Sequence, residues 1–367
     1  MLKGRDVVDV PGAREPDDAV PLQLLDIDGT LLARPPMPDE MVLDALRLMK
    51  LSRALDALAI KLQRLGRLGV YGPVHGQEAS VVGAAFALDP ARDWIVPAYR
   101  EQPAMLRHGL PLERLLAQYM GRIGGGRIPD EVNLLPRNQA VAAQIPHAVG
   151  LAWGLRIRKV RAAVLVYFGE GATSEGDFHE AANLAGVVAA PLILFLQNNG
   201  YAISTPRAQQ SAARSLAVRA RGYGFCGQLV DGNDLFAVYE ATRAAVDRAL
   251  AGGGPTLIES LTYRMGFHNT TDNPKAYRSD AELAEAAKRD PISRVEKYLL
   301  GTGCWSEERA AEMERSIGQE LEDALAKATA FPTPDPAEMF DNVYADPPAR
   351  VRQQRQELEF LRRKPPA

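Results

Sequence analysis

The chain contains little cysteine and little net charge. Its 367 residues include two cysteines, Cys226 and Cys304, which provide neither a disulfide framework nor a cysteine-rich metal site. The formal charge of −3 gives no electrostatic reason to expect nucleic acid or an anionic membrane as a partner. No apolar run is long enough to span a bilayer, and the first 18 residues are charged and broken by proline, unlike a signal peptide. We therefore expect a soluble cytoplasmic protein.

Proline, glycine and charge divide the chain into three predicted regions. Residues 1–38 are polar and proline-rich and are predicted to form an amino-terminal arm. Residues 39–278 begin with a helix whose leucines recur at steps of three and four until Gly66, a stripe typical of core or subunit contact, and continue as an α/β domain. Residues 279–367 are predicted to be helical, charged and peripheral. They end in a basic tail, more simply explained as solvated than as a docking segment, with Arg362, Arg363 and Lys364.

A strand, a helix and a second strand are predicted in the middle of the α/β domain. Residues 162–168 read AAVLVYF, a continuous apolar run that suits a strand buried on both faces. Residues 175–188 fit an amphipathic helix, and residues 192–197 fit the next strand. Such units are almost always right-handed and place their parallel strands side by side. Glu170 and Asn199, which follow the two strands, are therefore expected to meet at the carboxyl edge of the sheet. A further buried strand is predicted at 256–261.

Glu170 and Asn199 suit a site for a divalent cation and a diphosphate. Mg²⁺ prefers oxygen ligands and usually shares its coordination shell between protein oxygens and substrate phosphates. Glu170, the amide oxygen of Asn199 and one backbone carbonyl would leave positions for a diphosphate. Gly169 and Gly171 allow the backbone to approach phosphate oxygens, and the amino terminus of the following helix favours negative charge.

Ordered motifs along most of the chain resemble the α subunit of the thiamine diphosphate-dependent 2-oxo acid dehydrogenases, of the pyruvate or branched-chain type. The motifs are GRLGVYGPVHGQEAS (66–80), PAYRE (97–101), IPDEVNLLP (128–136), the GEG to QNN segment (169–199), VDGNDLFAVY (230–239), TYRMGFHNTTDN (262–273) and RDPISR (289–294). The resemblance implies the diphosphate-binding half of the thiamine diphosphate-binding fold, an α/β structure with a parallel sheet flanked by helices.

The resemblance implies a role for the residue at each matching position. Glu170 and Asn199 would bind Mg²⁺ with the carbonyl of Tyr201, and His268 would be the catalytic residue that faces the substrate. Tyr99, Arg100 and Arg264 would hold the diphosphate, and Val141 would take the place of a bulkier apolar side chain beneath the cofactor. The full set of implied cofactor-binding residues is Tyr99, Arg100, Val141, Gly169, Gly171, Ala172, Asn199, Arg264 and His268.

The implied reaction is the thiamine-dependent oxidative decarboxylation of a 2-oxo acid, with transfer of the acyl group to a lipoyl-bearing acyltransferase core. In two-chain members of the family a β subunit supplies the glutamate that activates the cofactor, so a heterotetramer of two α and two β chains is expected, with the α chain nearly inactive alone. Pyruvate is the expected substrate. The branched-chain acid 3-methyl-2-oxobutanoate remains an alternative, because a pocket distinguishes a methyl from an isopropyl group by only about 1–3 kcal/mol. Acetoin is a further alternative.

A second motif points to another enzyme class. LLDIDGTLL at residues 24–32, with Asp26, Asp28, Gly29 and Thr30, resembles the first motif of the haloacid dehalogenase-like phosphatases, in which paired aspartates bind Mg²⁺ and attack phosphate. PPMP follows where that fold needs a helix, and no later acidic motif for the metal is evident. A hairpin with an Asp-Gly turn explains the segment more simply.

The remaining histidines are weaker candidates. His179 lies within a predicted helix, where packing or a local hydrogen bond is the simpler explanation. His75 lies among glycine and proline turns and could reach the cofactor. His108 and His147 carry no functional pattern.

Overall fold

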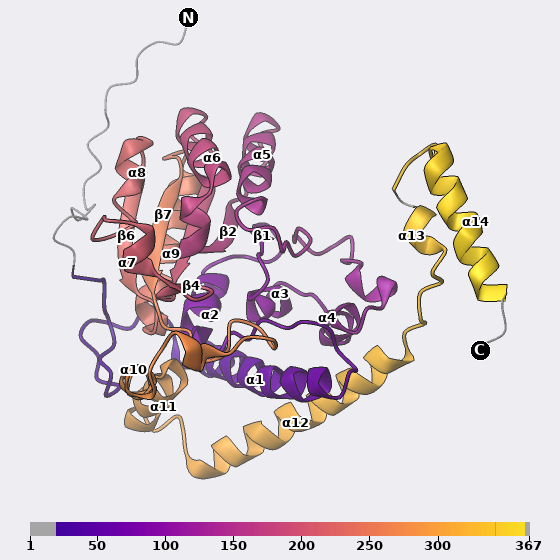
Figure 1. Ribbon diagram of the computed structural model, residues 1–367. Helices are drawn as coiled ribbons and strands as arrows, with labels where there is room; N and C mark the ends of the chain where they lie inside the picture. Colours follow the sequence, from indigo (N-terminus) through magenta and orange to yellow (C-terminus); the bar gives the residue numbers. More distant parts are fainter. Residues whose placement is uncertain (1–19, 342, 364–367) are drawn as a thin grey trace, which may run out of the picture.

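The central element is a parallel β-sheet with helices on both faces (Figure 1). The computed structural model describes residues 20–341 and 343–363, so the predicted arm before residue 20 and Lys364 of the predicted tail lie outside the described residues. Within this part of the chain the sheet has five parallel strands in the order β1-β2-β3-β7-β6. They are β1 (Trp94–Val96), β2 (Val164–Gly169), β3 (Leu192–Asn198), β6 (Cys226–Asp231) and β7 (Thr256–Leu261). The predicted α/β fold is confirmed.

Two apolar cores lie on opposite faces of the sheet and explain the continuous apolar runs of its inner strands. In β2, Leu165 and Tyr167 belong to one core, whereas Val166 and Phe168 belong to the other. Because both faces are covered, successive side chains of the strand must all be apolar. Helices α2 (Glu78–Phe86) and α9 (Leu235–Leu250) contribute to the first core, and α5 (Gln144–Ile157) and α6 (Gly176–Val187) contribute to the second.

The long helix α1 (Asp39–Arg64) carries the predicted leucine stripe. Leu51, Leu55 and Leu62 are buried in the first core, which confirms that the stripe packs inside the protein. The helix ends before Gly66, whose φ of +69° is the left-handed conformation that glycine adopts freely. Other short elements are α3 (Gln102–Arg107), α4 (Leu112–Tyr119), the 3₁₀ turns Ile123–Gly126 and Glu170–Ser174, the two-residue strands β4 (Tyr201–Ala202) and β5 (Thr205–Pro206), α7 (Arg207–Gln210), α8 (Arg219–Gly222) and the 3₁₀ turn Pro274–Ala276.

The Asp-Gly motif near the amino terminus forms a hairpin. Leu25 pairs with Leu31 in antiparallel fashion, and the N–H of Gly29 donates to the carbonyl of Asp26. Gly29 has a φ of +78°, and a Cβ there would lie 2.6 Å from the backbone nitrogen of Tyr298. The Asp26 side chain accepts from the next backbone N–H, and Asp28 is exposed beside Lys297. The segment is the predicted turn rather than a phosphatase centre.

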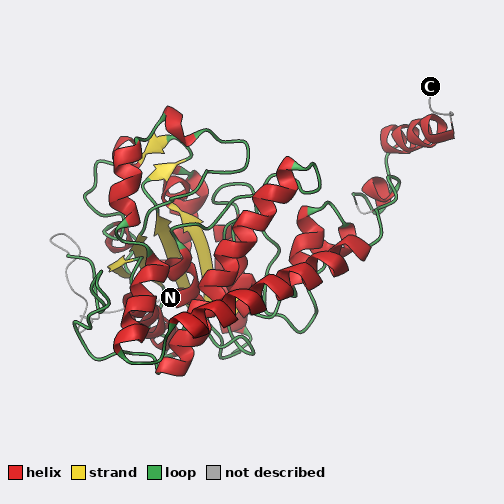
Figure 2. Cartoon of the chain, turned by 90° about the horizontal axis from the view of Figure 1, so that it is seen from below, coloured by secondary structure: helices red, strands yellow, loops and turns green. Residues whose placement is uncertain are grey.

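The chain is helical after residue 279, and only part of it is peripheral. Its helices are α10 (Asp280–Ala287), α11 (Pro291–Gly301), α12 (Glu307–Ala330), α13 (Glu338–Asp341) and α14 (Ala349–Arg363). Contrary to the prediction, α11 buries Val295 and Leu299 in a core shared with α1. Helices α13 and α14 stand away from the body in both Figure 1 and Figure 2.

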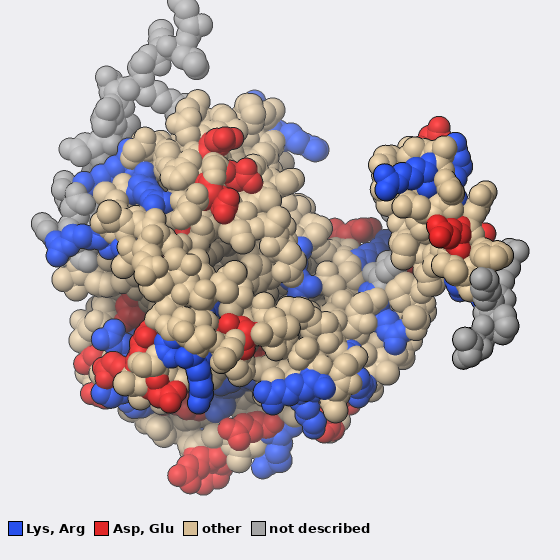
Figure 3. All heavy atoms as spheres, in the orientation of Figure 1, with Lys and Arg blue, Asp and Glu red and all other residues tan. Residues whose placement is uncertain are grey.

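No helix of the described residues is both long and apolar enough to cross a membrane. Acidic and basic side chains are intermixed on the face seen in Figure 3.

Arg294 of α11 connects the hairpin to the end of β6 through ion pairs and hydrogen bonds, and its side chain is almost completely buried. Its side chain is 1% exposed and contacts Asp231 at 2.9 Å and Asp234 at 3.7 Å. It also donates to the carbonyls of Leu25 and Asp26. Removing one partner of a buried ion pair leaves the other charge uncompensated, which costs more than the pair itself contributes.

Arg294→Met is therefore expected to lower the free energy of unfolding by about 3–5 kcal/mol, measured by urea denaturation. The matched control is Lys297→Met on the same helix, whose exposed pair with Asp28 should contribute at most about 1 kcal/mol. Equal effects of the two substitutions would contradict a structural role for the buried arginine.

Candidate active site

A cavity of about 210 Å³ lies at the carboxyl ends of β2 and β3. In open parallel sheets this edge is where ligands bind, because the connecting loops diverge there. The cavity is lined by every residue that the sequence analysis predicted to bind the cofactor, the metal or the substrate. Its lining includes Tyr99, Arg100, Val141, Gly169, Glu170, Gly171, Ala172, Asn199, Tyr201, Arg264 and His268.

Glu170 and Asn199 meet at the sheet edge, as the strand–helix–strand pattern predicted. The backbone N–H of Asn199 donates to Oε2 of Glu170 at 3.2 Å. Glu170 is 1% exposed, and its other oxygen, Oε1, is buried without a hydrogen-bond partner. Burial raises the pKa of Glu170, and the Asn199 N–H and the two nearby arginines only partly oppose this shift. A buried carboxylate oxygen without a partner is costly, so this atom is available to a cation.

The turn after β2 brings the backbone close to the following hairpin. A Cβ on Gly171 would lie 2.8 Å from the Cβ of Ala202 in β4, so glycine is required there for space. Gly169 is different, because a Cβ at that position would lie 4.0 Å from its nearest neighbour, the carbonyl oxygen of Gln197. The turn itself is fixed by Thr173, whose hydroxyl donates to the carbonyl of Glu170.

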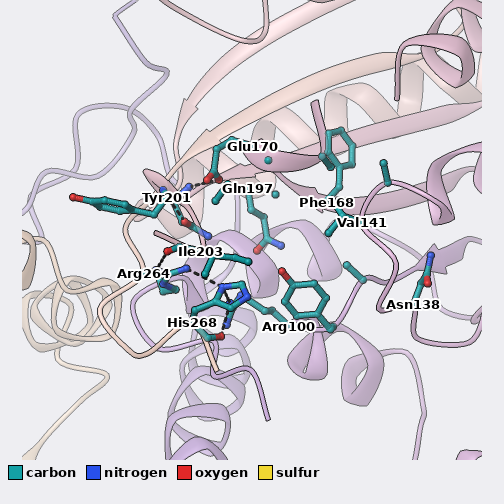
Figure 4. Close-up of a pocket in the computed structure, with 18 of the residues that line it drawn as sticks. Arg100, Asn138, Val141, Phe168, Glu170, Gln197, Tyr201, Ile203, Arg264 and His268 are labelled. Atoms are coloured by element: carbon teal, nitrogen blue, oxygen red, sulfur yellow. Dashed lines mark hydrogen bonds between the residues drawn. The ribbon is translucent and has the colours of Figure 1, made fainter. Parts of the chain in front are cut away.

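Two buried arginines flank His268 (Figure 4). Arg100 approaches Nδ1 of His268 at 2.8 Å and Arg264 approaches the same atom at 3.0 Å. The two side chains are 5% and 1% exposed, respectively, and no carboxylate of the described residues lies within ion-pair distance of either. Nε of Arg264 has no hydrogen-bond partner at all. Buried positive charges without an ion-pair partner favour an anionic ligand.

The arginines also set the protonation of His268. A guanidinium group can only donate hydrogen bonds, so Nδ1 accepts and the proton of the neutral ring is on Nε2. Burial, followed by the repulsion of Arg100 and Arg264, lowers the pKa of His268 to about 4. The backbone N–H of His268 donates to Asp272, which holds the segment in place. His268 is thus a neutral hydrogen-bond donor near pH 7.

Tyr201, Tyr99 and Val141 lie at the edges of the cavity. The Tyr201 ring points away from it, and its hydroxyl donates to Glu282 at 2.8 Å, so only the Tyr201 backbone could serve a cation (Figure 4). The Tyr99 ring lies edge-on to His268, with 6.1 Å between the ring centroids. Val141 is 50% exposed on the loop before α5, where it lines the cavity.

The residues of the cavity that the sequence prediction missed include Gln77, Glu101, Gln197 and Ile203. Gln77 is buried and accepts from the Asn199 amide at 3.1 Å, and Gln197 donates to the buried carboxylate of Glu101 at 2.7 Å. Ile203 has a φ of +56°, an unusual conformation for a β-branched residue, and its carbonyl accepts from Arg264. The neighbouring motifs GPVHGQE, PAYRE and QNN could have pointed to Gln77, Glu101 and Gln197, whereas Ile203 has no signal in the sequence.

The other histidines lie outside the lining of this cavity. His75 is half-buried, and burial lowers its pKa. His108 is buried and bonds the Asp93 carbonyl at 2.7 Å. His147 bonds the carbonyl of Ala143 within its helix, and His179 is exposed on α6 and bonds the Tyr223 hydroxyl.

Comparison with known proteins decides the family. Residues 46–337 match the family described as dehydrogenase E1 component. The chain belongs to this family. Two similar relatives, from Staphylococcus epidermidis and Staphylococcus aureus, are both named pyruvate dehydrogenase E1 component subunit alpha. They are 40% and 39% identical to this chain over 337 residues, which cover 91% of each protein. The predicted resemblance to the α subunit of a 2-oxo acid dehydrogenase is confirmed.

Thiamine diphosphate is the cofactor of the dehydrogenase E1 family, and the cavity fits its charged end. The unpartnered oxygen of Glu170 suits a cation, and the two arginines without an ion-pair partner suit a diphosphate. No group of three or more His, Cys, Asp or Glu side chains that could hold a metal occurs among the described residues. A cation here would therefore depend on one carboxylate, amide and backbone oxygens, and phosphate oxygens, which is the mixed shell that Mg²⁺ accepts.

Proposed function

We propose that this chain is the α subunit of a pyruvate dehydrogenase component, which decarboxylates pyruvate and passes the acetyl group to a lipoyl group of a partner protein. The relatives that are 40% and 39% identical to it over 337 residues carry that name. The observation that carries the proposal is that one cavity contains both a Glu170 oxygen without a hydrogen-bond partner and two buried guanidinium groups without an ion-pair partner.

The charged residues divide the binding of the cofactor between them. We propose that Glu170, the Asn199 amide oxygen and the Tyr201 carbonyl hold Mg²⁺, and that Arg100 and Arg264, with Tyr99, hold the diphosphate. When bound, thiamine diphosphate supplies a ring that accepts the electrons of the broken carbon–carbon bond. The remaining contacts would come from Val141 and from the turn at Gly169, Gly171 and Ala172, which all line the same cavity.

His268 is the proposed catalytic residue. With Nδ1 committed to the two arginines, its Nε2–H is free to donate to an oxygen of the substrate. A positioned donor of this kind contributes about 10²–10⁴-fold to a rate. The arginines fix the ring orientation and keep it neutral, so the same side chains would bind the anion and orient the histidine.

A β subunit is the proposed partner that completes the site. The cavity of about 210 Å³ is below the range of about 300–1,000 Å³ that is usual for ligand pockets, so this chain encloses only part of the cofactor. Exposed apolar side chains on the outer surface of α5 and α6 are typical of a subunit interface: Trp153, Ile157, Leu184 and Val187. We propose a heterotetramer of two α and two β chains. Its compartment would be the reducing cytoplasm, which suits the free thiols of Cys226 and Cys304.

The test measures the oxidation of pyruvate and of 3-methyl-2-oxobutanoate by the co-purified α–β complex. The reduction of a dye monitors the reaction. Turnover should require thiamine diphosphate and both subunits, and kcat/KM should be higher for pyruvate. A higher value for 3-methyl-2-oxobutanoate would assign the branched-chain enzyme instead. An intact complex that binds cofactor but oxidises neither acid would overturn the proposal and make acetoin the next substrate to assay.

A further inference from the structure

Gln77 is a buried side chain at the cavity with one bonded and one free end. It precedes α2, is 1% exposed and lines the cavity beside Glu170 and Asn199. Its Oε1 accepts from Nδ2 of Asn199 at 3.1 Å. Its Nε2 is buried without a hydrogen-bond partner. An amide N–H left unpaired in the interior costs about 1–3 kcal/mol, so a partner for Nε2 is to be expected in the working protein.

The bonded end of Gln77 decides which way the Asn199 amide faces. An asparagine amide can turn over, presenting either its oxygen or its NH₂ group to a neighbour. Because Gln77 takes Nδ2, the Asn199 oxygen is left to accept from the Tyr201 N–H at 3.2 Å, and one lone pair remains for a cation. The Tyr201 N–H holds the oxygen end of the same amide, so loss of Gln77 would remove the bond at Nδ2 that keeps the NH₂ group away from the metal position.

The free end of Gln77 can only donate. An NH₂ group cannot bind a cation, but it can bind a phosphate oxygen, and Gln77 lines a cavity that already contains two guanidinium groups for an anion. The backbone around it is fixed: the Gln77 N–H donates to the Val74 carbonyl at 2.8 Å, and Thr262 donates to the carbonyl of Gly76. Gly76 has a φ of +92°, and a Cβ there would lie 2.4 Å from the Tyr263 carbonyl.

We infer that Gln77 is a positioning and binding residue for the metal–diphosphate: it turns the Asn199 oxygen toward the cation and donates Nε2–H to a phosphate oxygen. The inference rests on the proposed function. It adds to the site a side chain with two distinct roles, one through its oxygen and one through its nitrogen. The two roles can be separated by substitution, because glutamate keeps the acceptor and loses the donor, whereas methionine of similar length loses both.

The test uses the α–β complex carrying Gln77→Met or Gln77→Glu. Isothermal titration calorimetry measures thiamine diphosphate binding at saturating Mg²⁺, and electron paramagnetic resonance measures Mn²⁺ binding at saturating cofactor. Gln77→Met should weaken both by about 10- to 100-fold, the usual effect of removing a group that orients a metal ligand. Gln77→Glu should weaken cofactor binding at least about 10-fold while Mn²⁺ affinity stays within about threefold. Thr242→Val removes a buried, unpartnered hydroxyl from α9, outside the cavity, and should change neither.

Each outcome decides between this inference and its alternatives. If both Gln77 variants bind cofactor and Mn²⁺ within twofold of the wild type, the inference is wrong. Equal losses in the two variants, with a lower unfolding temperature of the cofactor-free complex, would reduce Gln77 to a structural residue. If the methionine variant does not assemble, wild-type cofactor binding by Gln77→Glu would overturn the donor role. A wild-type complex that shows no Mg²⁺-dependent cofactor binding would overturn the proposed function as well.

Discussion

Glu170→Gln in the α–β complex is expected to abolish Mg²⁺-dependent binding of thiamine diphosphate. The substitution keeps the size of the side chain and an oxygen that can accept from the Asn199 N–H. It removes the negative charge, and Glu170 is the cavity carboxylate whose second oxygen has no partner. Losing a group that only orients a metal ligand costs about 10- to 100-fold in metal affinity, so losing the ligand charge itself should cost more than about 100-fold.

Titration calorimetry with and without Mg²⁺ measures this loss directly. Glu175→Gln is the matched control, because Glu175 also lines the cavity but is exposed to solvent, so its removal should change affinity by less than about threefold. The cofactor-free Glu170→Gln complex should be at least as stable as the wild type near pH 7, because burial raises the pKa of Glu170 and works against its charged form. Unchanged Mg²⁺-dependent binding by Glu170→Gln would show that the metal does not use this carboxylate.

The parts of the fold that the sequence predicted are those in which one residue pattern determines both burial and conformation. The strands predicted at 162–168 and 192–197 are found at Val164–Gly169 and Leu192–Asn198, and the strand at 256–261 is found with those bounds. All three are inner strands and are buried almost throughout, although the third also buries the polar side chains of Glu259 and Ser260. The placement of Glu170 against Asn199 follows from the parallel pairing of the first two strands.

The two edge strands were missed for a physical reason. β1 has only three residues, too few for a pattern to emerge. β6 is not buried along its whole length, and it includes Gly227, where a Cβ would lie 2.1 Å from the Ala217 carbonyl. Close packing requires glycine at this position, and a glycine interrupts the run of β-branched and apolar residues that is typical of a strand. Its outer side is partly covered by the amino-terminal segment, where Leu22 pairs with Val230, a contact between residues about 200 positions apart that no local pattern encodes.

The site was predicted through residues whose chemistry is recognisable in a motif, and its supporting residues were not. Gln77 lies two positions after His75 in the same motif. The histidine was the candidate for a contact with the cofactor, whereas the glutamine lines the cavity. The difference is tertiary: the turn is held by the buried carboxylate of Asp56, which accepts from the N–H groups of Val74 and His75. Burial raises the pKa of Asp56 to about 8. No local sequence pattern indicates that a helix residue 18 to 19 positions earlier orients this loop.

His268→Gln is expected to lower kcat for pyruvate by about 10²–10⁴-fold in the α–β complex. Glutamine can still accept from Arg100 and Arg264, so the arginines keep a partner, but it cannot present the same donor as Nε2–H. Cofactor affinity should change much less than kcat. His179→Gln is the control, because this histidine is exposed on α6, bonds the Tyr223 hydroxyl and lies outside the lining of the cavity, so activity should persist. A full-rate His268→Gln enzyme would exclude His268 from the reaction.

The same substitution should change the pH dependence of stability in a defined direction. The pKa of His268 is about 4 in the folded protein, lowered by burial and by Arg100 and Arg264, against 6.5 as its ordinary value. Between pH 6.5 and 4 the unfolded chain therefore binds more protons at this position than the folded one, and the histidine lowers stability progressively as the pH falls through that window. Urea midpoints of the cofactor-free complex should fall less steeply from pH 6.5 to 4 in His268→Gln than in the wild type. Because glutamine does not titrate, equal slopes would mean that His268 is not held neutral by the two arginines.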